Sequence, residues 1–325
     1  MQQQQLCDTV LANDWHVVAR SEDVTSEKPL AVKLLGEDIV LWRVGDQVCA
    51  WRDLCIHRGT RLSLGRIENE TIICPYHGWT YNAEGRCVRI PAHPEQIPPS
   101  KARAKVYRAT EKYGWVWVTL GETTQDVPVF EEWDDPSFRK IHCGPYTYKA
   151  SGPRAVENFL DVAHFPFVHQ GYLGDPIDPA INDYTAEITP EGVIARDISV
   201  WQPNPDGTGE GKRVHYTYKV PRPLSAYFMK TSTGPRFAMF FTVTPVSEQE
   251  SIAWAYVAID HTDQTDEEVR EFQNIITLQD IPVVESQRPE LLPLDLQAEL
   301  HLRSDRTSIA YRKWLRQLGL SFGTA

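Results

Sequence analysis

Short runs of β-branched and aromatic residues, separated by turn residues, fill the chain from residue 15 to about residue 120. Segments such as "WHVVAR", "AVKLLG", "DIVLWRV" and "QVCAWRD" each have the length and composition of one strand. "GDQ" at 45–47 and "NAEGR" at 82–86 are typical of hairpin turns, and "KVYRATEKYGWVWVTLG" predicts two more strands around a turn at 112–114. This region therefore predicts an all-β domain of small antiparallel sheets.

The rest of the chain mixes helical and strand periods. We predict a helix around 153–164, strands at 184–201, 212–220, 225–232, 236–245 and 251–260, and a helix from about 265. The last helix has a clear start, because Thr265 is a suitable N-cap and three acidic residues follow it. Val269, Phe272 and Ile276 then repeat on one face, and Asp280 is the next position of that stripe. This half predicts an α+β domain with a central antiparallel sheet.

Two domains are expected in a chain of 325 residues, because single hydrophobic cores rarely grow beyond about 250–300 residues. The segment "DVPVFEEWDDPSF" has the composition of a connector, so we place the domains at residues 1–125 and 126–325. Hydrophobic residues make up 42% and charged residues 24%, values that are typical of an ordered globular protein.

Charge and targeting signals narrow the function classes. A net charge of -11, without any basic run, argues against nucleic acid as a partner. The start "MQQQQLCDTVLANDW" does not have the pattern of a signal peptide, and no stretch of about 18 apolar residues predicts a membrane span. We therefore expect a cytoplasmic protein, in which cysteines are thiols or metal ligands rather than disulfides.

Cysteine and histidine spacing predicts a first metal site. The stretch "CIHRGTRLSLGRIENETIICPYHG" begins at Cys55 and contains C-x-H and C-x-x-H, with sixteen residues between His57 and Cys74. Zinc fingers usually take both cysteines from one turn and both histidines from another, whereas here each turn supplies one of each. The mixture favours a [2Fe-2S] cluster in which Cys55 and Cys74 hold one iron and His57 and His77 the other. Zinc and a purely structural role are the alternatives.

The other four cysteines have no cysteine or histidine at ligand spacing. We expect them to be small, partly buried thiols. They are Cys7, Cys49, Cys87 and Cys143.

A second metal site is predicted in "ENFLDVAHFPFVH" at 157–169. Pro166 disfavours helical geometry at the residue before it and should turn the chain just after His164, so that His164 and His169 converge. Two buried histidines among apolar residues need a partner, and a metal ion supplies one. They are one carboxylate short of the 2-His-1-carboxylate triad of non-heme Fe(II) enzymes.

Asp280 is the expected third ligand, because it interrupts an otherwise apolar helical stripe. Pro282 removes a backbone donor close by and predicts a local kink. Asp280 could instead cap that kink, and Glu285 is the alternative ligand.

Together, the two motifs resemble those of Rieske non-heme iron oxygenase α subunits. The family motif NxxDxxHxxxxH is matched by Asn158, Asp161, His164 and His169, and a helical aspartate follows downstream. The respiratory branch of Rieske proteins has additional loop cysteines where this chain has Thr60 and Tyr76. The segments "NDWHVVA", "IPAHP" and "SDRTSIAYRKWLRQLGL" are similar to the stand-alone demethylases and hydroxylases, including cyanobacterial hydroxylases that tailor guanidinium toxins such as saxitoxin.

The resemblance implies a Rieske domain followed by a helix-grip catalytic domain, assembled as a head-to-tail homotrimer. It implies that Asp161 links a histidine of the mononuclear site to a Rieske histidine of a neighbouring subunit, since the two metals of one chain lie too far apart. Asn158 would lie near the iron. The implied cofactors are a [2Fe-2S] cluster and mononuclear Fe(II), with O2 as co-substrate.

The electrons are expected from NAD(P)H through a separate reductase or ferredoxin. The chain has no plant-type C-x4-C-x2-C motif, and its "GTGEGK" at 207–212 falls in an expected hairpin loop rather than before a helix.

The family resemblance favours hydroxylation or oxidative demethylation of a small molecule by a monooxygenase. A cis-dihydroxylating aromatic-ring dioxygenase is the alternative, and a pure electron carrier is disfavoured because it would not need the second half of the chain. Phe237, Met239 and Phe241 alternate on one strand and could face a substrate pocket, although the same residues would serve equally as sheet core. "GYLGDPIDPAIND" at 171–183 could form an entrance loop. The sequence does not identify the substrate.

Overall fold

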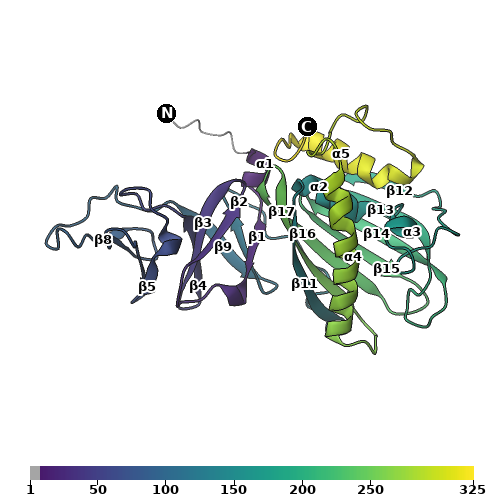
Figure 1. Ribbon diagram of the computed structural model, residues 1–325, viewed down its shortest axis with the longest axis horizontal. Helices are drawn as coiled ribbons and strands as arrows, with labels where there is room; N and C mark the ends of the chain where they lie inside the picture. Colours follow the sequence, from purple (N-terminus) through teal and green to yellow (C-terminus); the bar gives the residue numbers. More distant parts are fainter. Residues whose placement is uncertain (1–7) are drawn as a thin grey trace. The chain divides into compact units, whose positions relative to one another are not determined.

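The computed structural model describes residues 8–325 and divides the chain into two compact units, one up to Val127 and the other from Pro128 (Figure 1). The expected boundary, after residue 125, lies two residues before this division. Cys7 and the first residues used to exclude a signal peptide lie outside the described part. Within residues 8–325, none of the helices has both the length and the hydropathy that crossing a membrane requires.

The first unit contains two antiparallel sheets. The larger has the order β1-β10-β9-β4-β3-β2 and the smaller the order β5-β6-β7-β8. The strands of the larger sheet are β1 (His16–Arg20), β2 (Leu30–Leu34), β3 (Glu37–Val44), β4 (Gln47–Arg52), β9 (Val106–Lys112) and β10 (Trp115–Thr119). Those of the smaller sheet are β5 (Arg66–Glu68), β6 (Thr71–Ile73), β7 (Thr80–Tyr81) and β8 (Cys87–Arg89). The short helical segments are α1 (Thr9–Ala12), η1 (Ser21–Asp23) and η2 (Leu62–Leu64).

The hairpins predicted at "GDQ" and "NAEGR" join β3 to β4 and β7 to β8, so the all-β prediction for this unit is confirmed. One core connects both sheets, because Trp42 and Trp51 of the larger sheet are fully buried in a cluster with Tyr81 of the smaller one. The two tryptophan rings meet edge to face, with their centroids 5.0 Å apart.

A seven-stranded antiparallel sheet forms the centre of the second unit, with the order β11-β17-β16-β15-β14-β13-β12. Its strands are β11 (Arg139–Tyr148), β12 (Thr185–Thr189), β13 (Gly192–Gln202), β14 (Lys212–Arg222), β15 (Ser225–Thr231), β16 (Phe237–Ser247) and β17 (Glu250–Ile259). The helices are α2 (Gly152–Leu160), α3 (Phe165–Val168), α4 (Asp266–Ser286) and α5 (Arg306–Leu318), with the turn η3 (Arg303–Asp305) before α5.

The three longer helices lie against the same sheet. α4 packs on β11, α2 on β16 and β17, and α5 on β12 and β13, while α2 also touches both of the other helices. Figure 1 shows α4 running across the sheet, and this arrangement confirms the predicted antiparallel sheet with helices. α4 begins as predicted, because Thr265 and Glu268 form a reciprocal capping box.

The predicted helix over 153–164 is too long. α2 ends at Leu160, and Asp161 is its extended C-cap with φ −87° and ψ 127°. The Asp161 carboxylate accepts a hydrogen bond from the backbone N–H of Ala163 at 2.7 Å, and this local turn competes with the next helical turn. Asp161 and His164 therefore do not share a helical face.

The expectation for Pro166 is also wrong. Pro166 lies in the first turn of α3, where its missing N–H has no helical partner to lose, so it helps to start a helix. The predicted single strand at 184–201 is the hairpin of β12 and β13. Pro282 lies inside α4, which continues to Ser286.

A buried ion-pair network holds α2 and α5 together. The Arg312 guanidinium of α5 donates to Glu157 of α2 at 2.5 and 2.7 Å and to Glu299 at 2.6 Å. Arg154 of α2 donates to the same Glu299 at 2.9 Å. Both arginines are only 2% exposed, so the buried positive charge of each needs these carboxylates as partners.

Candidate metal centres and substrate cavity

Two loops of the first unit carry the cysteine and histidine pairs. In each loop, the glycine four residues after the cysteine donates its N–H to the cysteine carbonyl, at 2.9 Å from Gly59 to Cys55 and 3.1 Å from Gly78 to Cys74. The glycines have φ values of +74° and +66°, a backbone conformation that residues with a larger side chain rarely adopt. The two loops are therefore built alike, and each presents one sulfur and one imidazole.

The side chains of these loops face one another. The rings of His57 and His77 have centroids 4.5 Å apart, and His57 also stacks on Trp79. Cys55 and Cys74 are 2% and 1% exposed, and the Cys55 Sγ lies 3.1 Å from the Tyr81 hydroxyl.

The donor set fits a cluster with two thiolate and two imidazole ligands. Nδ1 of His57 is buried and has no hydrogen-bond partner among the described residues, as expected for an atom reserved for a metal. Burial lowers the pKa of His57, and His77 and Arg58 act in the same direction, which favours the neutral imidazole that metals bind.

The cysteines outside the loops behave as structural thiols. Cys49, Cys87 and Cys143 are buried and form no disulfide among the described residues. Burial raises the pKa of Cys49 to about 11 and that of Cys143 to about 12, so both remain protonated at neutral pH.

The second unit brings His164, His169 and Asp280 together. Nε2 of His164 lies 3.1 Å from Nε2 of His169, and Oδ1 of Asp280 lies 3.3 Å and 3.1 Å from these two nitrogens. The histidines flank the single turn of α3, and the aspartate comes from α4. Three ligand atoms thus surround one point from three segments, in the donor set of the 2-His-1-carboxylate triad.

Other polar groups orient these side chains. Nδ1 of His169 lies 2.8 Å from the Gln279 side-chain oxygen, so it is the donor and leaves Nε2 free as a ligand. The Asn158 amide donates to Asp280 Oδ1 at 3.4 Å, and Asp161 Oδ2 lies 3.4 Å from His164 Nδ1. Gln279 was missed by sequence reasoning, because a glutamine beside the expected ligand carries no motif signal.

The charges around this point favour a cation. Burial alone would lower the pKa of His164, but Asp161 and Asp280 raise it to about 9. Burial would also raise the pKa of Asp280, yet His164 and His169 hold it below its usual value. A metal ion satisfies the carboxylate and both imidazoles at once. Glu285, the alternative ligand, instead accepts a hydrogen bond from the Lys149 backbone N–H.

A cavity of about 90 Å³ adjoins the three residues. Its walls are formed largely by side chains of β14–β16 and of α4. The ring of Phe159, which also lines the cavity, stacks on Phe241 with a centroid distance of 4.5 Å. The predicted pocket residues Phe237, Met239 and Phe241 all line this cavity; Met239 and Phe241 are only 4% exposed, so they also belong to the core. From the expected entrance segment, Leu173 contributes to the lining.

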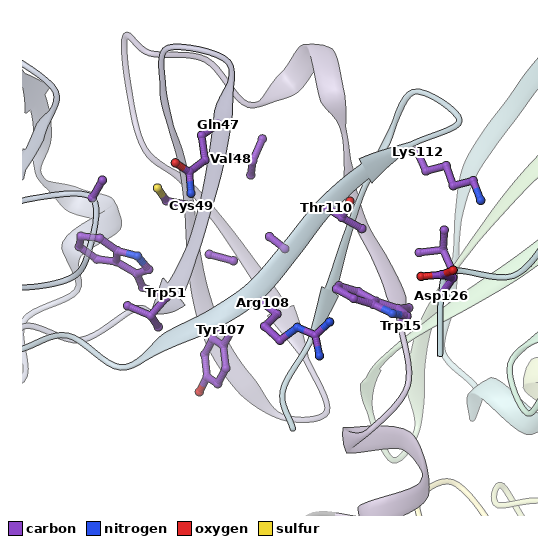
Figure 2. Close-up of a pocket in the computed structure, with 15 residues that line it drawn as sticks. Trp15, Gln47, Val48, Cys49, Trp51, Tyr107, Arg108, Thr110, Lys112 and Asp126 are labelled. Atoms are coloured by element: carbon purple, nitrogen blue, oxygen red, sulfur yellow. The ribbon is translucent and has the colours of Figure 1, made fainter. Parts of the chain in front are cut away.

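The first unit has a larger hollow, of about 480 Å³, beside β4 and β9 (Figure 2). These strands pair only through Ala50–Tyr107 and Trp51–Val106 and then separate. Figure 2 shows Arg108 and Trp15 on one side of this opening, and the guanidinium lies 5.3 Å from the indole centroid. None of the predicted metal ligands lines the hollow, so the cavity of the second unit is the candidate active site.

Comparison with known proteins covers both units. Residues 14–109 match the Rieske [2Fe-2S] domain family, and residues 148–321 match the vanillate O-demethylase oxygenase C-terminal domain family. Methylxanthine N1-demethylase NdmA of Pseudomonas putida is 33% identical over 320 residues, which cover 95% of this chain and 89% of the relative. The solved structure of Pseudomonas putida CBB5 NdmA with caffeine superposes with a TM-score of 0.81 and 30% identity, covering 94% of this chain and 90% of that one.

A shorter match concerns an oxidoreductase. Oxidoreductase NdmD of Pseudomonas putida is 39% identical over 112 residues, which cover 34% of this chain and 19% of that protein.

Proposed function

Because this chain belongs to the Rieske non-heme iron oxygenases, we propose that it oxidises a methyl group of a small planar substrate at a mononuclear iron held by His164, His169 and Asp280. The convergence of these three side chains at the wall of an aromatic cavity carries the proposal. Cys55, His57, Cys74 and His77 are the proposed ligands of the [2Fe-2S] cluster.

The metals supply electron transfer and O2 reduction when they are bound. The side chains of the protein do the rest: Gln279 holds the His169 ring, Asn158 holds Asp280, and the apolar walls exclude water from the reacting methyl group. Hydroxylation of an N-methyl group consumes O2, two electrons and two protons, and releases water. The carbinol that forms then loses formaldehyde and leaves the demethylated amine.

N-methylated heteroaromatic compounds are the proposed substrates. The support is the likeness to a methylxanthine N-demethylase and the stacked aromatic rings that line the cavity. The demethylase relatives favour the monooxygenase reaction over cis-dihydroxylation, and the catalytic domain makes a pure electron carrier untenable. A role in tailoring toxins stays an expectation from the sequence resemblance.

We infer that electrons pass between subunits of a homotrimer. His77 is exposed, and three apolar side chains of the segment 55–78 are exposed too: Ile56 (50%), Leu64 (68%) and Tyr76 (64%). Such an apolar surface favours a protein partner. Asp161 lies beside His164 with its side chain 35% exposed, so it could contact both His164 and an incoming Rieske histidine.

A separate reductase supplies the electrons, and the likeness to part of NdmD supports a partner of that kind. The protein would be cytoplasmic, where NAD(P)H is available.

Iron analysis and turnover test the function together. The wild-type protein should contain about three irons per chain, two in the cluster and one mononuclear. With a surrogate reductase and an N-methylated substrate, it should release one formaldehyde for each O2 consumed.

Asp280→Ala should lower the iron content to about two per chain and abolish formaldehyde release, while the cluster spectrum survives. Glu285→Ala is the matched control and should retain all the iron. If Glu285→Ala lost iron and Asp280→Ala did not, the ligand assignment would be wrong.

A further inference from the structure

One lysine faces the aromatic cavity. Lys230 lies on β15, where its side chain points to the same face as Phe228, and its backbone pairs with Tyr216 of β14 and Phe237 of β16. All four residues line the cavity. Among the described residues of that lining, Lys230 is the single lysine and there is no arginine.

The ammonium group of Lys230 has few protein partners. Its Nζ donates to the Pro205 carbonyl at 3.2 Å and lies 4.9 Å from the centre of the Phe237 ring. An ammonium group can donate three hydrogen bonds, so this environment leaves part of its hydrogen-bonding capacity unused.

No carboxylate within the described part of the chain forms an ion pair with Lys230. Asp206 is the acidic residue whose charge raises the pKa of Lys230. Its carboxylate is already paired with Lys212, at 2.7 Å. The one acidic residue in the cavity lining is Asp280, which belongs to the metal centre. Burial accordingly lowers the pKa of Lys230 to about 8, with Asp206 opposing the change.

A half-buried cation without an anion is unfavourable, and the other strand residues around it are mostly aromatic or apolar. An apolar residue at 230 would complete the wall without that cost. A lysine here therefore indicates a ligand whose negative charge completes the site.

We propose that Lys230 is a substrate-binding residue that pairs with an ionised oxygen of the substrate. The substrate is then a planar, methylated aromatic compound with an anionic group, such as a carboxylate, bound at the Lys230 end of the cavity while the methyl group faces the metal centre. This inference rests on the proposed function, because it uses the same cavity and the same reaction.

Binding of two matched probes tests the proposal. The probes are 1-methylindole-3-carboxylate and its neutral carboxamide, titrated calorimetrically into the iron-loaded protein without O2 or reductant, so that no turnover occurs. The wild-type protein should bind the carboxylate about 10- to 100-fold more tightly than the carboxamide.

Three variants complete the test. Lys230→Met should lose this preference, Lys230→Arg should keep most of it, and Lys313→Met, which removes an exposed lysine of α5, should behave as wild type. The cluster spectrum and far-UV circular dichroism verify folding, and Lys230→Gln serves if the methionine variant does not fold.

A wild-type protein that binds neither probe, or both equally, would overturn the proposal, as would a Lys230→Met variant that keeps the preference. Failure of the proposed function gives a different result. In that case, the carboxylate preference persists, but neither probe releases formaldehyde when O2 and a reductase are added.

Discussion

Single side chains around the mononuclear centre divide into those that a motif marks and those that it does not. The NxxDxxHxxxxH motif predicted His164 and His169, and the interrupted apolar stripe indicated Asp280. Gln279 carries no such signal, because only the folded helix places its oxygen 2.8 Å from His169. Spacing finds residues with fixed chemical roles, whereas supporting contacts depend on three-dimensional placement.

Gln279 should control how tightly iron is held. Gln279→Leu removes the acceptor that fixes the His169 ring, so we expect the affinity for mononuclear iron to fall about 10- to 100-fold. Competition with a ferrous chelator measures this loss. Gln317→Leu changes an exposed glutamine of α5 and should have no effect. Equal affinities for both variants would exclude an orienting role for Gln279.

Lys230 should make substrate binding depend on pH. Its pKa of about 8 means that the ammonium is mostly charged at pH 7 and mostly neutral at pH 9. The affinity for the carboxylate probe should therefore fall about tenfold over that range, because the neutral amine does not pair with an anion. Asp206 and Tyr216 near it do not titrate there, because Lys212 lowers the pKa of Asp206 to about 2 and burial raises that of Tyr216 far above this range.

Titration of the probe at pH 7 and pH 9 measures this dependence. His164 also lines the cavity, and Asp161 and Asp280 raise its pKa to about 9, so the titration uses the iron-loaded protein, in which His164 is expected to bind iron rather than a proton. Lys230→Met should bind with the same affinity at both values. A wild-type affinity that does not change between them would contradict the assignment.

The sequence predicts some helices and strands better than others. The capping box of α4 and the hairpins of the first unit were predictable, since their signals are local. α5 was not predicted as a helix, because its buried face includes Thr307 and Arg312 beside Ala310 and Leu315, which hides the apolar stripe. The predicted helix was longer than α2, because the sequence alone does not show the hydrogen bond from Ala163 to the Asp161 side chain that ends it.

The contact between α2 and α5 should depend on Arg312. Arg312→Met removes two hydrogen bonds from buried Glu157 and leaves it only the longer contact with Arg154 at 3.7 Å, so we expect the free energy of unfolding to fall by about 3–5 kcal/mol. Urea denaturation followed by circular dichroism measures the change. Arg316→Met, one turn later on the exposed side of α5, is the control and should change stability by less than about 0.5 kcal/mol. A similar loss in both variants would mean that the network does not stabilise this contact.

For the molecule as a whole, the order of two motifs was enough to predict a Rieske domain followed by a helix-grip domain, and the family matches confirm both. The substrate could not be predicted in the same way. Phe237, Met239 and Phe241 all line the cavity, but Met239 and Phe241 also pack in the core, and a strand pattern does not separate these roles. The charge of Lys230 becomes informative only when the fold places it in that lining.

Electron transfer between subunits should depend on Asp161. Asp161→Asn retains an oxygen that can accept from Ala163 but loses the negative charge beside His164. We expect about three irons per chain and an unchanged oligomeric state, with turnover reduced more than about 100-fold. Iron analysis, light scattering and single-turnover oxidation of the reduced cluster test these points.

Asp263→Asn, an exposed change before α4, is the control. Full activity of Asp161→Asn would remove the bridging role, and loss of iron would mean that Asp161 is needed to form the site.

The proposed mononuclear ligands lie on α4 and around α3, whereas much of the cavity wall is made by alternate residues of β14–β16. Chemistry and much of the selectivity are thus encoded in separate segments of the gene, although α4 supplies both Asp280 and part of the wall. A single nucleotide change in the codon of a wall residue can enlarge or narrow the cavity or change its charge. The proposed iron ligands are not altered, because the hydrogen bonds of the sheet do not depend on the side chain. This separation gives natural or laboratory evolution a route to new substrates through small steps that each preserve a working oxygenase.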